Sequence, residues 1–127
     1  MQSDFVVNPS NFREIPYGSA GYRLECGLRD EVLRKPLGMR LADDDLSAEA
    51  GQRHFGWFEG ETLLACVIAA PLAESVVKLR QMAVSPSAQG RGLGRLLLEN
   101  LEAELIRHGC RQVTLHARVS ALGFYTK

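Results

Sequence analysis

A glycine-rich run in the second half of the chain carries the clearest chemical signal. Gln89-Gly90-Arg91-Gly92-Leu93-Gly94 joins an apolar extended segment to the start of an amphipathic helix. The first turn of a helix presents backbone N–H groups without an intrahelical partner, together with the positive end of the helix dipole, so it attracts anions. Glycines let the backbone approach such a ligand closely, and successive amides in a turn can converge on it. The run therefore predicts a binding site for a diphosphate group.

Two familiar phosphate-binding loops do not fit this run. The dinucleotide-binding fingerprint needs a third glycine at the position held by Arg95, and no Gly-Lys-Ser/Thr sequence follows, as it would in a P-loop. Rossmann and P-loop sites are therefore not predicted. An NAD-dependent enzyme stays only as a rival hypothesis, which predicts stabilisation by NADH.

The segment from Val84 to Gly94 resembles the coenzyme A signature of the GNAT superfamily of N-acetyltransferases, written Gln/Arg-x-x-Gly-x-Gly/Ala, and every fixed position matches. The resemblance extends to Ala121-Leu122-Gly123-Phe124-Tyr125, which is similar to the Ala-x-x-Phe-Tyr of many members. Leu28-Arg29-Asp30-Glu31-Val32-Leu33-Arg34 with Pro36-Leu37-Gly38 is similar to the first-helix segment of small bacterial GNAT proteins. The resemblance implies an α/β fold with a mixed sheet and acetyl-CoA as co-substrate.

The resemblance also implies how coenzyme A is held. Backbone N–H groups of residues 89–94 would bind the pyrophosphate, and Arg91 and Arg95 either assist or are ordinary exposed arginines. Main-chain groups of the preceding strand would receive the two amides of the pantetheine arm as if it were an added strand. The implied cofactor-binding residues are Met82, Ala83, Val84, Gln89, Gly90, Arg91, Gly92, Leu93, Gly94 and Arg95.

Acetyl transfer from a thioester to an amine needs a neutral nitrogen, stabilisation of an oxyanion and a proton for the departing thiolate. The resemblance implies that Tyr125 supplies this proton, since a phenol with a pKa of about 10 can protonate a thiolate whose thiol has a pKa of about 8.5. A core tyrosine is the alternative interpretation. The strand amide near Met82 or Val84 would polarise the carbonyl.

The general base has several candidates. His116, at the end of the last predicted strand, is the first choice, with a structural histidine as the alternative. Glu74 and Glu61 lie at loop positions and are otherwise ordinary surface carboxylates. His54 and His108 have structural explanations, at a strand start and a helix end. No histidine or cysteine spacing predicts a metal site.

The apolar pattern predicts the elements that must position these residues. Ser19 is expected to cap the first helix, and Gly109 to close the second. The strands are predicted at residues 12–17, 54–58, 62–70, 75–84 and 112–117, and the helices at 19–34 and 93–108. The apolar stripes of the helices are Tyr22, Leu24, Cys26, Leu28, Val32 and Leu33, and Leu93, Leu96, Leu97, Leu101, Leu105 and Ile106.

The order of these elements predicts a mixed sheet. A turn at Gly60 makes the second and third strands antiparallel, and residues 71–74 form the next connection. The strand, helix and strand across residues 75–117 require a right-handed crossover between parallel strands. Residues 43–50 are expected to form a polar loop with solvated charges.

Composition limits the class of protein. A chain of 127 residues that is 46% apolar fits a single domain, residues 1–127, in which residues 1–11 could form a tail. The 15 basic and 15 acidic residues cancel, so neither nucleic acid nor a membrane surface is an expected partner. Cys26, Cys66 and Cys110 are odd in number and widely spaced, which favours the reducing cytoplasm. No secretory signal or membrane-spanning run is present.

The sequence departs from the family at its carboxyl end. Members of the superfamily continue beyond the Phe-Tyr segment with two more strands, whereas this sequence ends at Lys127. The expectation is a truncated sheet with an open edge, which invites pairing with another chain, such as a second copy in a homodimer. The function expected is an acetyl-CoA-dependent N-acetyltransferase acting on a primary amine of a small molecule or a protein. The alternative is a non-catalytic acyl-CoA-binding or interaction module.

Overall fold

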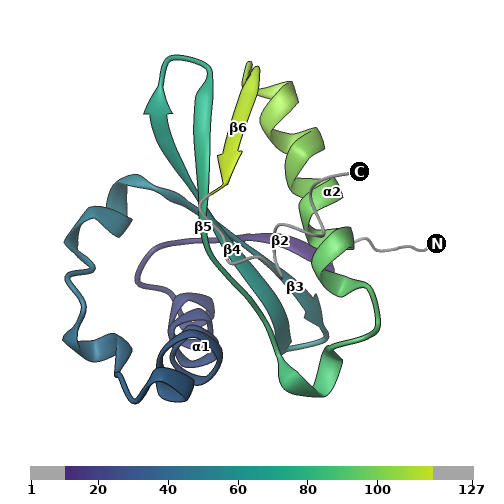
Figure 1. The fold of residues 1–127 in the computed structure, drawn as a ribbon. Helices are drawn as coiled ribbons and strands as arrows, with labels where there is room; N and C mark the ends of the chain where they lie inside the picture. The colour runs from purple at the N-terminus through teal and green to yellow at the C-terminus, as the bar shows by residue number, and fades with distance from the viewer. Residues whose placement is uncertain (1–10, 116–127) are drawn as a thin grey trace.

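The computed structural model describes residues 11–115, which form a five-stranded sheet with helices on both faces (Figure 1). The strands are β2 (Phe12–Ile15), β3 (Arg53–Glu59), β4 (Thr62–Ala73), β5 (Val76–Val84) and β6 (Gln112–Leu115). The long helices are α1 (Ala20–Arg29) and α2 (Leu93–Arg107). A π-helix covers Asp30–Arg34, and 3-10 turns cover Lys35–Leu37, Leu41–Asp43, Ser47–Gly51 and Pro86–Ala88.

The sheet has the order β2-β3-β4-β5-β6 and is mixed, as the sequence predicts. Neighbours from β2 to β5 are antiparallel, whereas β6 runs parallel to β5 from the pair Val76–Gln112 to the pair Leu79–Leu115. Helix α2 makes the crossover between these parallel strands (Figure 1). The glycine-rich turn therefore lies between the end of β5 and the start of α2.

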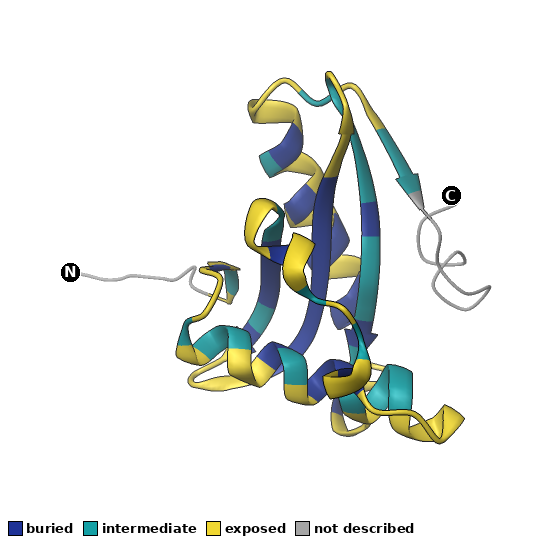
Figure 2. Cartoon of the chain, turned by 90° about the vertical axis from the view of Figure 1, so that its left-hand side faces the viewer, coloured by how far each residue is buried: buried dark blue, intermediate teal, exposed yellow. Residues whose placement is uncertain are grey.

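Strand β4 lies at the centre of two cores because successive side chains point to opposite faces. Ala65, Val67 and Ala69 pack with the apolar face of α2, whereas Cys66 packs with Leu28 of α1. Figure 2 shows the resulting band of buried strand residues in dark blue, with the helices exposed on their outer sides. Both faces of β4 are therefore covered.

Helix α1 begins as predicted and ends earlier. The Ser19 side chain caps it by accepting a hydrogen bond from the Tyr22 N–H at 3.2 Å. The predicted helix to residue 34 instead widens into the π-helix after Arg29. The side chains of this segment bind the following loop, since Asp30 accepts from the Leu41 N–H and Arg34 pairs with Asp44. These tertiary contacts override a uniform α-helical geometry.

Two other predictions are corrected by the structure. Residues 71–73 belong to β4 rather than to a connection, with Pro71 opposite Val77. The last β3–β4 pair is Arg53–Ala69, so β4 has one strand neighbour at Pro71, and a missing N–H is tolerated there. In α2, Leu96 and Ile106 are exposed and Leu98 is buried. No helix within residues 11–115 combines the length and apolarity needed to cross a membrane.

Candidate functional site

The glycine-rich turn has the backbone geometry of an open anion site. Gly90 and Gly92 have φ angles of +87° and +77°, a region that disfavours residues with a Cβ atom. A Cβ atom at either position would meet nothing within 4 Å, so the glycines serve backbone conformation and leave room for a ligand. Gly92 is the N-cap of α2 and makes no side-chain cap, in contrast to Ser19 at α1.

The amides of this turn are largely unused by the described chain. Among the backbone N–H groups of residues 89–95, only that of Arg91 donates within residues 11–115, to the Ala88 carbonyl at 3.3 Å. The first hydrogen bond of α2 runs from the Leu96 N–H to the Gly92 carbonyl. The turn is exposed from Gln89 to Gly92. Free amides, an exposed turn and the positive helix end together fit a diphosphate.

Strand β5 presents main-chain groups next to this turn. The Ser85 N–H donates to the Leu64 carbonyl at 2.8 Å, so these two residues form a hydrogen-bonded pair. Bonded and non-bonded pairs alternate in an antiparallel ladder, so Cys66–Ala83 is bonded and Ala65–Val84 is not. The N–H and C=O groups of Val84 therefore point away from β4, whereas those of Ala83 face it. The geometry favours Val84 and its alternate neighbour Met82 over Ala83 as pantetheine contacts.

The edge to which these groups point is open within the described chain. Residues 11–115 provide a β6 partner for β5 only from Val76 to Leu79. The Val84 carbonyl accepts a hydrogen bond from Gln89 Nε2 at 3.2 Å, so the first residue of the glycine-rich run braces the end of the strand. Within residues 11–115, the stretch of β5 between Leu79 and the turn therefore has no strand neighbour on this side.

A β-bulge interrupts β5 beside this edge. Cys66 lies opposite Ala83 and Ile68 opposite Arg80, so Gln81 and Met82 together face Val67. Gln81 has a φ of +56°, an uncommon angle for a residue other than glycine. The bulge turns the Gln81 side chain toward α1, where Arg29 Nε donates to its Oε1 at 3.4 Å. The sequence gives no local signal for this bulge.

The charged candidates near the turn have definite places. Arg91 pairs with Glu59 at the end of β3, and both side chains are about half exposed. Glu61 lies in the adjacent β3–β4 turn, at the same end of the sheet. Glu74 lies in the β4–β5 turn, and a strand rise of about 3.3 Å per residue puts it roughly 20 Å from the bulge. Glu74 is therefore badly placed for chemistry beside Met82.

A buried ionic cluster lies behind the bulge, on the α1 face. It consists of Glu25 and Arg29 from α1, Glu49 from the following loop and His54 from β3, all at most 2% exposed. Arg29 donates from Nη1 to Glu25 Oε2 at 2.9 Å and grips both oxygens of Glu49 at 2.9 and 2.6 Å. The Tyr22 hydroxyl donates to Glu49 Oε1 at 2.7 Å. The prediction of solvated charges at residues 43–50 is therefore wrong for Glu49. Its carboxylate is buried because Arg29 compensates its charge.

The cluster shifts the pKa values of its members. Burial opposes ionisation of Glu49, but hydrogen bonds from Arg29 and Tyr22 outweigh burial and lower the pKa of this carboxyl. Burial likewise opposes the charged form of His54, yet its hydrogen bonds to Glu25 and to the Glu49 carbonyl raise the pKa of the imidazole. Glu25, Glu49 and His54 offer atoms within 4.8 Å of one another, as metal ligands do. The Arg29 guanidinium bonds both carboxylates, so the group is an ion-pair cluster.

The sequence contains a signal for this cluster that the apolar pattern hides. Glu25, Leu28, Arg29 and Val32 lie at helical spacing on one face, with an acid and a base at positions i and i+4. The predicted stripe instead included Leu24, which is 47% exposed. A charged pair in line with core residues could therefore have indicated a buried ion pair. The partners Glu49 and His54 could not be found from spacing.

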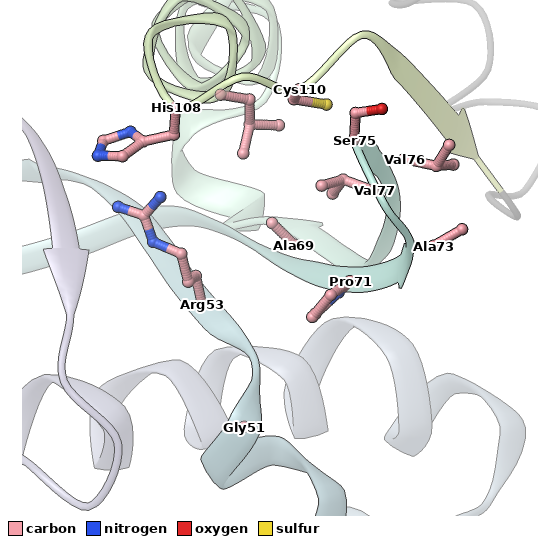
Figure 3. Close-up of a pocket in the computed structure, with 11 residues that line it drawn as sticks. Gly51, Arg53, Ala69, Pro71, Ala73, Ser75, Val76, Val77, His108 and Cys110 are labelled. Atoms are coloured by element: carbon pink, nitrogen blue, oxygen red, sulfur yellow. The ribbon is translucent and has the colours of Figure 1, made fainter.

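A separate pocket lies at the other end of the sheet (Figure 3). It has a volume of about 220 Å³ and lies between the β4–β5 turn and the carboxyl end of α2. Figure 3 shows Arg53 and His108 on one side and Cys110 and Ser75 on another. Its lining consists of Gly51, Arg53, Ala69, Pro71, Ala73, Ser75, Val76, Val77, Leu105, His108 and Cys110. None of these belongs to the predicted coenzyme A site.

The proposed acid and base, Tyr125 and His116, lie outside the described residues. The other histidines have structural partners, as the sequence suggests. His54 belongs to the buried cluster, and His108 caps α2, with Nδ1 3.0 Å from the Glu104 carbonyl oxygen. Cys66 is completely buried within β4.

Comparisons with known proteins agree with this architecture. Residues 22–127 match the model of the acetyltransferase (GNAT) family. A candidate N-acetyltransferase from Lactobacillus plantarum superposes with a TM-score of 0.75 at 19% identity, covering 91% of this chain and 82% of that chain. ElaA from Escherichia coli gives a TM-score of 0.74 at 18% identity, covering 90% and 82%. The ribosomal-protein-S18-alanine N-acetyltransferase from Escherichia coli gives a TM-score of 0.65 at 19% identity, covering 90% of this chain and 74% of that chain.

The sequence identities are low whereas the TM-scores are high, so the solved structures support the fold alone. The family match spans most of the chain and includes the glycine-rich turn. Such a fold and family support acyl-CoA-dependent acetyl transfer. The chain therefore belongs to the acetyltransferase (GNAT) family.

Proposed function

We propose that this protein is an N-acetyltransferase that moves the acetyl group of acetyl-CoA directly to a primary amine of a small molecule or a protein. The observation that carries the proposal is the run of backbone N–H groups at residues 89–95, of which only that of Arg91 donates within residues 11–115, next to the end of β5 that lacks a strand neighbour in this part of the chain. One ligand that joins a diphosphate to an extended diamide arm would use both features. Acetyl-CoA has this form.

The roles of the residues follow from this placement. The turn from Gln89 to Arg95 holds the pyrophosphate with backbone donors, and Arg95 adds an exposed positive charge. The arm pairs with Met82 and Val84, which brings the thioester toward the bulge at Gln81. The Met82 N–H then stabilises the oxyanion that forms when the amine attacks.

Proton transfer completes the reaction. The amine must lose a proton before or during attack, and the departing thiolate must gain one. We assign the second step to Tyr125, in keeping with the family resemblance, and the first to His116, the first-choice base at the end of the last predicted strand. The free cysteines Cys26, Cys66 and Cys110 agree with the proposed location in the cytoplasm.

Ligand-dependent stability tests the cofactor. At a concentration one hundred times its Kd, a ligand stabilises the native state by about 2.7 kcal/mol, which raises the melting temperature measurably. Acetyl-CoA should raise the Tm and NADH should not. Stabilisation by NADH alone would show that the turn serves a different nucleotide.

Release of free thiol tests the transfer step. Coenzyme A should accumulate when acetyl-CoA is mixed with a panel of primary amines, and Tyr125→Phe should lower the rate by about 10²-fold or more, as is typical of general acid catalysis. Tight binding without turnover across a broad panel would instead favour a non-catalytic acyl-CoA-binding module. The two assays therefore separate binding from catalysis.

A further inference from the structure

Gln81 adopts a backbone conformation that its own side chain does not favour. Its φ of +56° lies in the left-handed region, where glycine is comfortable and a residue with a Cβ atom is not. The residue forms the bulge of β5, directly before Met82. Something outside the local backbone must therefore hold this conformation.

The bulge places two consecutive side chains on one face of the sheet. Arg80 lies opposite Ile68, and its Nη1 donates to Gln52 Oε1 at 3.0 Å. The same Nη1 lies 3.6 Å from Glu49 Oε2. Gln81 accepts from Arg29 Nε on the same face. In a regular strand these neighbours would point to opposite faces. Both are thus tied to the buried cluster.

The donor that reaches Gln81 is rigidly held. The terminal nitrogens of Arg29 bond Glu25 and Glu49, and the Arg29 side chain is 1% exposed. A guanidinium is planar, so fixing both terminal nitrogens also fixes the direction of Nε–H. That remaining donor is aimed at Gln81 Oε1. The buried cluster therefore presents a preset anchor to the bulge.

We propose that Arg29 and Gln81 are positioning residues for acetyl transfer: the anchored Gln81 side chain keeps residue 81 left-handed and thereby aims the Met82 N–H at the carbonyl of the bound acetyl group. The inference rests on the proposed function, because it gives the Met82 amide its task. Loss of the anchor lets residue 81 relax toward an ordinary strand conformation. The amide then points elsewhere, while the glycine-rich turn still binds the pyrophosphate.

Two substitutions at one position separate anchoring from mere contact. Gln81→Met keeps a similar length but removes the acceptor oxygen, so kcat should fall about tenfold, as expected when an oxyanion donor is misaligned. Gln81→Gly removes the whole side chain but adopts positive φ without a steric penalty, so kcat should stay within about threefold of wild type. The KM for acetyl-CoA should change less than about twofold in both variants, because the turn is intact.

If the Gln81 side chain acted only through packing, the two variants would have the opposite order of activity. Glycine removes more contacts than methionine, so a merely structural side chain would make Gln81→Gly the more damaged enzyme. An equal or greater loss of kcat in Gln81→Gly, or a fully active Gln81→Met, would overturn the proposal. Thermal unfolding of both variants verifies that they are folded during the assay.

An NMR measurement tests the anchor independently of activity. Residues with positive φ show a strong intraresidue NOE between the amide and Hα protons. This signal should be present at residue 81 in the wild type and should weaken in Gln81→Met. If the wild type neither binds nor turns over acetyl-CoA, the proposed function fails, and this signal still decides the anchor. An unchanged NOE in Gln81→Met would refute it.

Discussion

The imidazole of His54 and the carboxylate of Glu25 form a buried hydrogen-bonded pair, with Nδ1 2.9 Å from Oε2. The other ring nitrogen, Nε2, lies 2.9 Å from the carbonyl oxygen of Glu49. A carbonyl oxygen and a carboxylate both accept hydrogen bonds, so both ring nitrogens donate and His54 is an imidazolium. With Arg29, two positive charges then balance the two carboxylates of the cluster.

This charge balance predicts a pH-dependent stability. The pKa of His54 is raised in the folded state, so the pair contributes its full stability below the unfolded pKa of about 6.5 and loses it as the pH rises through the folded value. Urea unfolding of the wild type at several values between pH 6 and pH 9 should show a falling free energy of unfolding. His54→Gln should be less stable at pH 6 and should lose most of this slope.

The exposed His108 offers a matched control. Its side chain is 58% exposed at the end of α2, so His108→Gln should retain the pH dependence. A wild-type stability that rises over this range, or a full slope in His54→Gln, would contradict a buried imidazolium.

Removing Arg29 should lower the free energy of unfolding far more than removing the partly exposed Arg53. Arg29→Met leaves Glu25 and Glu49 buried without their cation, which should cost about 3–5 kcal/mol of unfolding free energy. Arg53→Met breaks the pairs with Glu14 and Glu104, but the Arg53 side chain is 35% exposed, so about 1 kcal/mol or less is expected. Chemical denaturation of both variants measures the difference. Equal costs would mean that the cluster contributes no more than surface pairs.

The features predicted from sequence are those encoded over short distances. The turn at Gly92 and the apolar repeat from Leu93 to Leu105 are local, and the structure reproduces them as an uncapped helix start and a buried helix face. The hairpin at Gly60 is equally local and determines the β3–β4 pairing. Such signals depend on backbone conformation and on side-chain period, which neighbouring residues set.

The features missed depend on contacts between distant residues. Glu49 meets Arg29 across 20 positions, and His54 meets Glu25 across 29. The bulge at Gln81 likewise depends on a register between β4 and β5 that no run of residues in β5 encodes. Burial of a charge is favourable only when its partner is in place, so single-residue preferences predict the opposite, an exposed side chain. The buried side of the candidate site is therefore a tertiary property.

Two glycines outside the turn should respond oppositely to alanine. Gly27 is exposed within α1, and a Cβ atom there meets nothing within 4 Å, so Gly27→Ala should stabilise the protein by about 0.5–1 kcal/mol. At Gly56 a Cβ atom would lie 2.6 Å from Leu63 Cδ1 and 3.0 Å from Ile15 Cδ1, inside a packed core. Gly56→Ala should cost about 1–3 kcal/mol. The midpoints of urea unfolding measure the stability of both variants. A stabilised Gly56→Ala would show that the side chains of Leu63 and Ile15 move aside at little cost.

The two ends of α2 provide a matched test of the proposed diphosphate site. Gly92 and Gly109 have φ angles of +77° and +89°, and a Cβ atom meets nothing within 4 Å at either position. Each alanine variant should therefore lose a similar stability, about 1–2 kcal/mol for a left-handed residue. Only Gly92→Ala disturbs the amides that face the ligand, so only this variant should show a smaller rise in Tm with acetyl-CoA.

Titration calorimetry should give a Kd at least about tenfold weaker for Gly92→Ala, the equivalent of about 1.4 kcal/mol, and an unchanged Kd for Gly109→Ala. Equal affinities in the two variants would place the diphosphate elsewhere, because the backbone strain is matched and only the position along the helix differs.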